Sequence, residues 1–123
     1  AGTSDGVIHV YNYDNRIQKL RSFRAASDCF ITSMAVHLTH PYVLSSAYHC
    51  IKLWDWNKGW KCTQSFEQEH SDTIGQVAFN PMDTNIFASA SDDQTVKVYM
   101  GFYFFADWKV LLSTVHTLLV VHV

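Results

Sequence analysis

Three stretches of this chain alternate apolar and polar residues in the same way and end in an aromatic residue. They lie at residues 8–11, 51–54 and 96–99 and read Ile-His-Val-Tyr, Ile-Lys-Leu-Trp and Val-Lys-Val-Tyr. Such alternation is typical of a β-strand that buries one face. The closing aromatics stand at positions 11, 54 and 99, so the pattern recurs at intervals of 43 and 45 residues. The sequence therefore predicts one sheet-forming unit that is repeated along the chain.

The length of the interval and the turn residues between the stretches predict the kind of unit. A period in the forties with a Trp-Asp ending, here Trp54-Asp55, is typical of β-propeller blades. A second pair of anchors, Ser27-Asp28 and Ser71-Asp72, is 44 residues apart. Turn signals at 4–6, 57–59 and 92–94 separate the strands. We expect a blade end over 1–24, a full repeat over 25–67 with strands at 31–36, 42–46, 51–56 and 61–66, and a repeat over 68–100 with strands at 74–79, 86–91 and 95–100.

The pattern ends after Met100, and residues 101–123 are expected to form an atypical hydrophobic tail outside the repeats. Asp107 and Lys109 interrupt this tail, which leaves the 14 apolar-rich residues 110–123. A membrane-spanning helix needs about 20 residues, so we predict no transmembrane span. The tail is interpreted as a non-native or alternatively spliced terminus, or as a segment that pairs as improvised strands.

Composition limits the class of protein. Hydrophobic residues make up 48% of the 123 residues, charged residues 16%, and the net charge is −2, which favours a packed domain and excludes a strongly basic nucleic-acid-binding surface. The three cysteines, Cys29, Cys50 and Cys62, form no paired framework and suit a reducing, cytoplasmic compartment. The chain begins at Ala1 with no signal peptide and no methionine, so we expect it to be an excerpt of a longer protein.

Candidate catalytic and metal-binding residues are few. His37, His40, Cys50 and Cys62 could be drawn as a zinc site, but zinc fingers use close cysteine pairs and the sequence has none. It also has no G-x-S-x-G motif and no glycine-rich phosphate loop. We predict no catalytic residue, no metal and no cofactor. A metal-dependent hydrolase on the same scaffold is the alternative, and elemental analysis for bound zinc would reveal it.

Four cations lie on and beside the stretch at 17–23, which has the length of an outer strand: Arg16, Lys19, Arg21 and Arg24. Such charges discourage the unwanted pairing of an exposed sheet edge. A role of these cations in binding a partner is the alternative. Strands at the two broken ends of so short an array would lack neighbours, so oligomerisation is a further hypothesis.

Several phrases of the sequence resemble the WD40 repeat family, and within it the amino-terminal propellers of the coatomer β′ subunits in their plant form. The matching phrases are Val-Tyr-Asn-Tyr at 10–13, Ala-Val-His at 35–37, Ile-Lys-Leu-Trp-Asp-Trp at 51–56, Phe-Asn-Pro at 79–81 and Phe-Ala-Ser-Ala-Ser at 87–91. The Trp-Asp-Trp ending followed by Lys-Gly-Trp at 58–60 makes the match specific. The resemblance covers about residues 1–100 and implies an all-β protein, a partial WD40 β-propeller of about two and a half four-stranded antiparallel blades.

The resemblance also implies a polar tetrad in each blade, made of a histidine, a serine or threonine, a turn aspartate and the strand tryptophan. The second repeat supplies candidates for all four places, with a tyrosine in the tryptophan place: His70, Ser89 or Ser91, Asp93 and Tyr99. In the first repeat Ala26 stands in the histidine place and Tyr48 in the aspartate place, and Trp54 is the one member expected to remain. We expect each polar group left unpaired to cost about 1–3 kcal/mol.

The function implied is that of a non-catalytic subunit of the COPI vesicle coat in transport between the Golgi and the endoplasmic reticulum. The partners implied are the alpha and epsilon coat subunits and dilysine tails of membrane cargo, with no nucleic acid and only peripheral contact with Golgi membranes. The acidic pair that receives such tails maps onto Asp28 and position 47, which is Ala47 here. We therefore expect dilysine binding to be weak or absent. The alternative is a substrate receptor of a cullin ubiquitin ligase.

Overall fold

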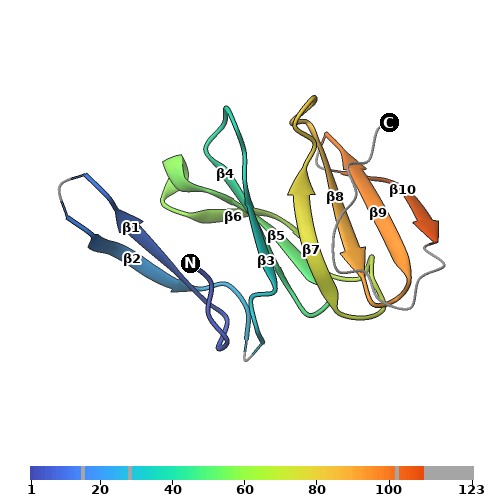
Figure 1. Ribbon diagram of the computed structural model, residues 1–123, viewed down its shortest axis with the longest axis horizontal. Helices are drawn as coiled ribbons and strands as arrows, with labels where there is room; N and C mark the ends of the chain where they lie inside the picture. Colours follow the sequence, from blue (N-terminus) through green and yellow to red (C-terminus); the bar gives the residue numbers. More distant parts are fainter. Residues whose placement is uncertain (15, 28, 102, 110–123) are drawn as a thin grey trace.

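Three antiparallel sheets lie side by side in the computed structural model, which describes residues 1–14, 16–27, 29–101 and 103–109 (Figure 1). A two-stranded sheet comes first, and two four-stranded sheets follow with the orders β3-β4-β5-β6 and β7-β8-β9-β10. The elements are β1 (Val7–Asn12), β2 (Gln18–Arg24), β3 (Ser33–Val36), β4 (Tyr42–Ala47), β5 (Cys50–Asp55), the 3-10 turn η1 (Trp56–Lys58), β6 (Lys61–Phe66), β7 (Ile74–Phe79), β8 (Ile86–Ser91), β9 (Thr95–Met100) and β10 (Tyr103–Lys109). The prediction of an all-β propeller segment of about two and a half blades is confirmed.

Strand β10 lies in the tail 101–123 that the sequence places outside the repeats, and pairing as improvised strands was one of the two interpretations of this tail. In the structure Tyr103–Lys109 pairs antiparallel with β9 and completes the second four-stranded sheet. Gly101 adopts a φ of 61°, a left-handed conformation that glycine reaches without strain, and it turns the chain between the two strands. The rest of the predicted tail, 110–123, lies outside the described residues. Within the described part, no helix is long and apolar enough to cross a bilayer.

One irregularity recurs in all three sheets and supports the repeat. The register shifts by one residue opposite the closing aromatic of β1, β5 and β9, that is, beside Tyr11, Trp54 and Tyr99. Such a bulge bends the outer strand and increases its twist. The three aromatics therefore hold the same place in their sheets, as the 43- and 45-residue intervals predict. Their burial differs: Tyr99 and Trp54 are buried, whereas Tyr11 in the two-stranded sheet is 39% exposed.

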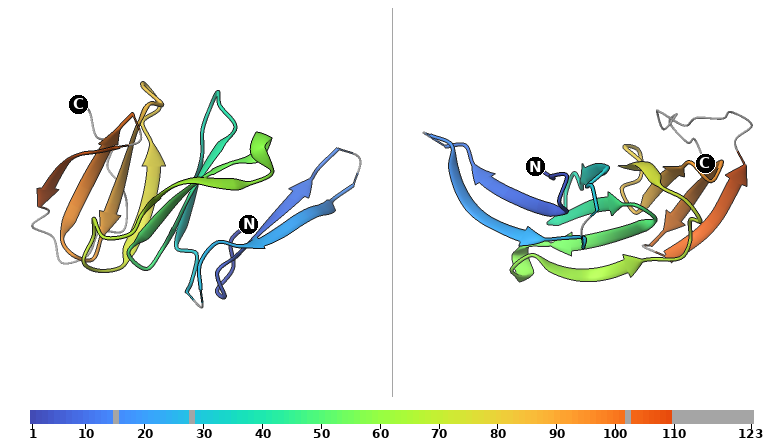
Figure 2. Two further views of the ribbon diagram at one scale, coloured as in Figure 1. Left: turned by 180° about the vertical axis from the view of Figure 1, so that it is seen from behind. Right: turned by 90° about the horizontal axis from the view of Figure 1, so that it is seen from below.

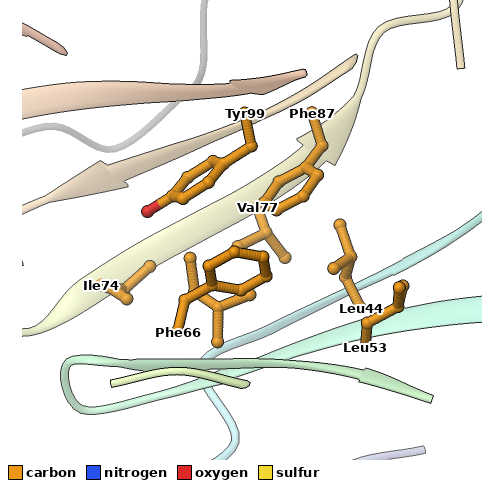
Figure 3. Packing of buried hydrophobic residues seen from close by; sticks show 8 residues of the cluster. Leu44, Leu53, Phe66, Ile74, Val77, Phe87 and Tyr99 are labelled. Atoms are coloured by element: carbon orange, nitrogen blue, oxygen red, sulfur yellow. The ribbon is translucent and has the colours of Figure 1, made fainter. Parts of the chain in front are cut away.

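The main hydrophobic core lies between the two four-stranded sheets (Figure 3). The first sheet contributes Leu44, Ile51, Leu53 and Phe66, and the second contributes Ile74, Val77, Phe87 and Tyr99. Phe87 and Tyr99 stack with ring centroids 4.4 Å apart, and Phe66 reaches across to both rings. The alternating apolar residues of each strand thus face the neighbouring sheet, which is the packing that adjacent propeller blades require.

A second core holds the two-stranded sheet against β5 and β6. Figure 2 shows the backbone of these strands from two further sides. Trp54 packs against Phe23 of β2 with ring centroids 4.7 Å apart, and Trp60 contacts the same phenylalanine. Arg21, one of the four cations of the predicted outer strand, donates from Nη1 to the Gly59 carbonyl at 2.6 Å. Arg24 donates to the Asp5 carbonyl at 2.9 Å. Two of the four cations therefore bind the chain itself, while Arg16 and Lys19 are exposed.

Candidate functional site

A buried chain of hydrogen bonds joins β8, β9 and the segment before β7 in the second repeat. Nε2 of His70 lies 2.6 Å from the Ser89 hydroxyl, and Nδ1 lies 2.9 Å from Oδ2 of Asp93. The Tyr99 hydroxyl interacts with Ser89 and extends the chain. Because a carboxylate only accepts hydrogen bonds, Nδ1 carries the proton and Nε2 accepts from Ser89. Four predicted tetrad residues therefore meet in one network.

Ser91, the other serine that the sequence left open, has a different role. Its hydroxyl donates to the Asp72 carbonyl at 3.1 Å and accepts from the Asp93 amide at 3.1 Å. Thr95, which the sequence analysis did not single out, donates to the Asp93 carboxylate from both its amide and its hydroxyl. The hairpin between β8 and β9 is thus built to hold the carboxylate toward His70.

Burial and hydrogen bonding set the ionisation of this network. Burial lowers the pKa of His70 below its usual 6.5 and outweighs the opposing effect of Asp93, so the ring is neutral at pH 7. Burial alone would raise the pKa of Asp93, but hydrogen bonds from Thr95, His70 and the Ser71 amide hold it at about 2. Burial raises the pKa of Tyr99. At pH 7 the network therefore consists of one charged acceptor, the Asp93 carboxylate, and neutral His70 and Tyr99. This arrangement suits a structural role.

These shifts predict a stability that falls with acid in two steps. A histidine kept neutral by folding binds more protons when unfolded, so stability should decline as the pH falls below 6.5. The carboxylate contribution is present above pH 3.8 and should be lost as the pH falls toward 2. Urea midpoints measured from pH 8 to pH 2 would show both steps. His70→Gln should shrink the first step, and an unchanged pH profile in this variant would contradict the assignment.

The first repeat retains part of the hydrogen-bonded network seen in the second repeat. Nε1 of Trp54 donates to the Ser45 hydroxyl at 2.9 Å, and both side chains are buried. The expectation that only Trp54 remains is therefore corrected. Ser45 and Ser89 are 44 residues apart, the interval that already relates Ser27 to Ser71, and this spacing was the signal that could have found it.

The histidine and aspartate of this repeat have no substitutes. Ala26 stands 44 residues before His70, as predicted. Tyr48, predicted in the aspartate place, lies instead in a two-residue loop between β4 and β5, where the second repeat has the three residues 92–94. Tyr48 is 49% exposed with a φ of 52°. The shorter loop leaves the Asp93 position without a counterpart.

A cavity of about 220 Å³ lies beside Ala26, which stands in the histidine place of the first repeat. Its walls include groups from the segment before β3, from β4 and β5, and from the residue after β6: Ala25, Ala26, Ser27, Cys29, Ser45, Ala47, Cys50, Lys52 and Glu67. The ammonium group of Lys52 donates to the Ala25 carbonyl at 2.9 Å. Burial raises the pKa of Cys50, so this thiol stays protonated and is a poor nucleophile.

Asp28, the predicted cargo contact, lies outside the described residues. Its sequence neighbours Ser27 and Cys29 line the same cavity as Ala47. Of the two positions that the resemblance pairs as a cargo site, Ala47 alone is described, and it lines this cavity. Dilysine binding there stays a prediction.

The candidate zinc residues do not converge. Nδ1 of His37 accepts from the Thr39 and His40 amides at 3.2 and 3.1 Å, so this histidine closes the turn between β3 and β4. Its ring also packs edge-on against Phe79 at 5.0 Å. Among the residues that the structure describes, no three histidine, cysteine, aspartate or glutamate side chains lie close enough together to hold a metal ion.

Comparison with known families matches this architecture. The family described as WD domain, G-beta repeat matches residues 17–55 and 60–99, which is more than half of the chain. The chain belongs to the WD40 repeat family. Proteins of this family are typically non-catalytic scaffolds.

Among individual proteins, the chain is similar to coatomer β′ subunits over a short segment. Coatomer subunit beta'-2 of Oryza sativa subsp. japonica is 67% identical over 46 residues, and that of Arabidopsis thaliana is 63% identical over 46 residues. Coatomer subunit beta' of Rattus norvegicus is 52% identical over the same length. The aligned segment is 37% of this chain and 5% of each relative.

A solved structure confirms the fold. Chaetomium thermophilum Sqt1, bound to the N-terminus of the ribosomal protein L10, superimposes with a TM-score of 0.78 over 88% of this chain and 30% of that chain. The two sequences are 21% identical, so the likeness concerns the fold alone.

Proposed function

We propose that this chain is a non-catalytic, coatomer β′-like component of the COPI coat that acts by binding proteins and peptides. The observation that carries the proposal is the 63–67% identity with plant coatomer β′ subunits over 46 residues. WD40 repeats in general diverge far more, as the 21% identity to Sqt1 illustrates at a TM-score of 0.78. The retained identity therefore points to a shared surface as well as a shared fold.

The arrangement of polar groups supports a binding role. In the second repeat, His70, Ser89 and Asp93 bind one another and are buried, so none of them is presented to a substrate. The expected partners are the alpha and epsilon coat subunits and, weakly, dilysine cargo tails. The protein would work in the cytoplasm and at the periphery of Golgi membranes and COPI vesicles.

Affinity capture tests this proposal directly. The tagged chain, incubated with cytosol, is expected to retain the alpha and epsilon coat subunits. Leu44→Asp is the control, since it places a charge in the core between the two four-stranded sheets and should abolish capture that depends on the folded surface.

Capture of a cullin ligase adaptor in place of coat subunits would overturn the proposal. Receptors of that class usually carry an arginine two residues after Trp-Asp, where this chain has Asn57. The absence of this arginine is why we favour the coat.

A further inference from the structure

The cavity of the first repeat can be compared residue by residue with the filled network of the second. Three positions are related by 44 residues, namely Ala26 with His70, Ser45 with Ser89, and Ala47 with Ser91. Beyond the shortened loop the offset becomes 45, which relates Cys50 to Thr95 and Trp54 to Tyr99. Ser45, Cys50 and Lys52 in the cavity walls therefore correspond to Ser89, Thr95 and Lys97, which interact with the imidazole of His70 in the other repeat. The cavity has an alanine, Ala26, in the place of His70 itself.

We propose that this cavity binds an imidazole group, or another small azole that accepts one hydrogen bond and donates one, in the place equivalent to the His70 side chain. The inference rests on the two repeats alone and is independent of the proposed coat function. Its volume of about 220 Å³ is sufficient. An engineered protein cavity of roughly 150 Å³ already admits benzene, which is larger than a five-membered ring.

The hydrogen-bonding direction favours an azole over a purely apolar ligand. The indole of Trp54 can only donate, so it uses a lone pair of the Ser45 oxygen and leaves the hydroxyl hydrogen for another acceptor. The Ser45 hydroxyl lines the cavity, and because a hydroxyl group rotates, its hydrogen can turn toward an acceptor placed there. In the second repeat the corresponding hydroxyl, on Ser89, faces Nε2 of His70 at 2.6 Å. An azole nitrogen would occupy the same position.

The charged groups of the cavity select the neutral form of the ligand. Among the described residues that line the walls, one ammonium, on Lys52, and one carboxylate, on Glu67, are charged, and their charges offset each other. The Glu67 carboxylate accepts from the Ser65 hydroxyl at 3.2 Å and retains lone pairs for the N–H of the azole. Among the described lining residues, this carboxylate is the acidic group available to accept from the ligand, as Asp93 accepts from His70.

Titration of the whole chain with imidazole at pH 8, at constant ionic strength, tests the inference. We expect a saturable rise in Tm with a half-maximal effect at about millimolar concentration, as expected for so small a ligand. The indole N–H resonance of Trp54, assigned with Trp54→Phe, should shift with the same midpoint because this group binds Ser45. Pyrrole has the same size and donates but does not accept, so it should bind at least tenfold more weakly.

Two variants locate the effect. Ala26→His should supply the ring from the chain and abolish the response, whereas Ser45→Ala keeps the cavity and should weaken binding at least tenfold. An equal response to pyrrole and imidazole, or a Trp54 resonance that does not move, would overturn the inference even if Ala26→His fails to fold. A second titration uses N-acetylhistidine amide in place of imidazole. Binding of this compound would show that the cavity also accepts a histidine side chain that is part of a polypeptide.

Discussion

Replacing His70 with alanine is expected to lower the free energy of unfolding by about 3 kcal/mol. The side chain is fully buried and joins Ser89 to Asp93, whose side chain is only 7% exposed. Its removal takes one partner from each of these groups and leaves a cavity where the ring contacted Ser89 of β8 and Asp93 of the following hairpin. Urea unfolding followed by tryptophan fluorescence would measure the change.

His40→Ala is the matched control. It removes the same side chain from an exposed position and should change the free energy of unfolding by no more than about 0.5 kcal/mol. Equal urea midpoints for the two variants would show that the buried network adds nothing to stability.

The first repeat shows how the chain tolerates the loss that His70→Ala would introduce. It already lacks the histidine and the aspartate, yet β3 to β6 form a regular four-stranded sheet. Its stability comes from the two cores on either side, where Leu44, Leu53 and Trp54 are buried. The polar network is therefore an addition to hydrophobic packing in this fold and not its foundation.

The strands and their order could be predicted because both depend on local patterns. Alternation along residues 51–54 and 96–99 places one face of each strand in the core, and a repeat of 43–45 residues sets the spacing of the sheets. Strand β10 could be stated only as one of two alternatives for the tail, because pairing with the edge of β9 uses backbone groups and places little demand on the side-chain pattern. The turn at Gly101 was the local signal.

The site was harder to predict because it depends on loop length and on how a cavity is filled. The loop at Tyr48 and His49 is one residue shorter than 92–94, so Ser45 and Trp54 are nine residues apart where Ser89 and Tyr99 are ten apart. When the two repeats are aligned on Trp54 and Tyr99, Ser45 is therefore one residue out of register with Ser89, and the correspondence is not evident. The repeat pattern also does not predict whether neighbouring side chains fill the space beside Ala26, because that depends on how the side chains pack.

Under the proposed function the cavity would bear on cargo binding, because Ala47, one of the two predicted cargo positions, lines it beside Ser27 and Cys29. The side chain at position 47 is buried, yet it borders about 220 Å³ of open volume, so a larger residue can be accommodated there without displacing the core. Lys52 lines the same cavity and would repel the ammonium group of a lysine. We therefore expect both the absence of a carboxylate at position 47 and the presence of this cation to weaken dilysine binding.

Ala47→Asp is therefore expected to strengthen the binding of a dilysine-tailed peptide by about tenfold or more, since a charge-assisted hydrogen bond contributes about 1.5–3 kcal/mol. Attraction between the new carboxylate and Lys52 keeps the gain near the lower limit. Calorimetry with the peptide would measure it, with Ala47→Asn as the neutral control of equal shape. Micromolar binding by the unchanged chain would contradict the predicted weakness, and equal affinities of the Asp and Asn variants would remove position 47 from the cargo site.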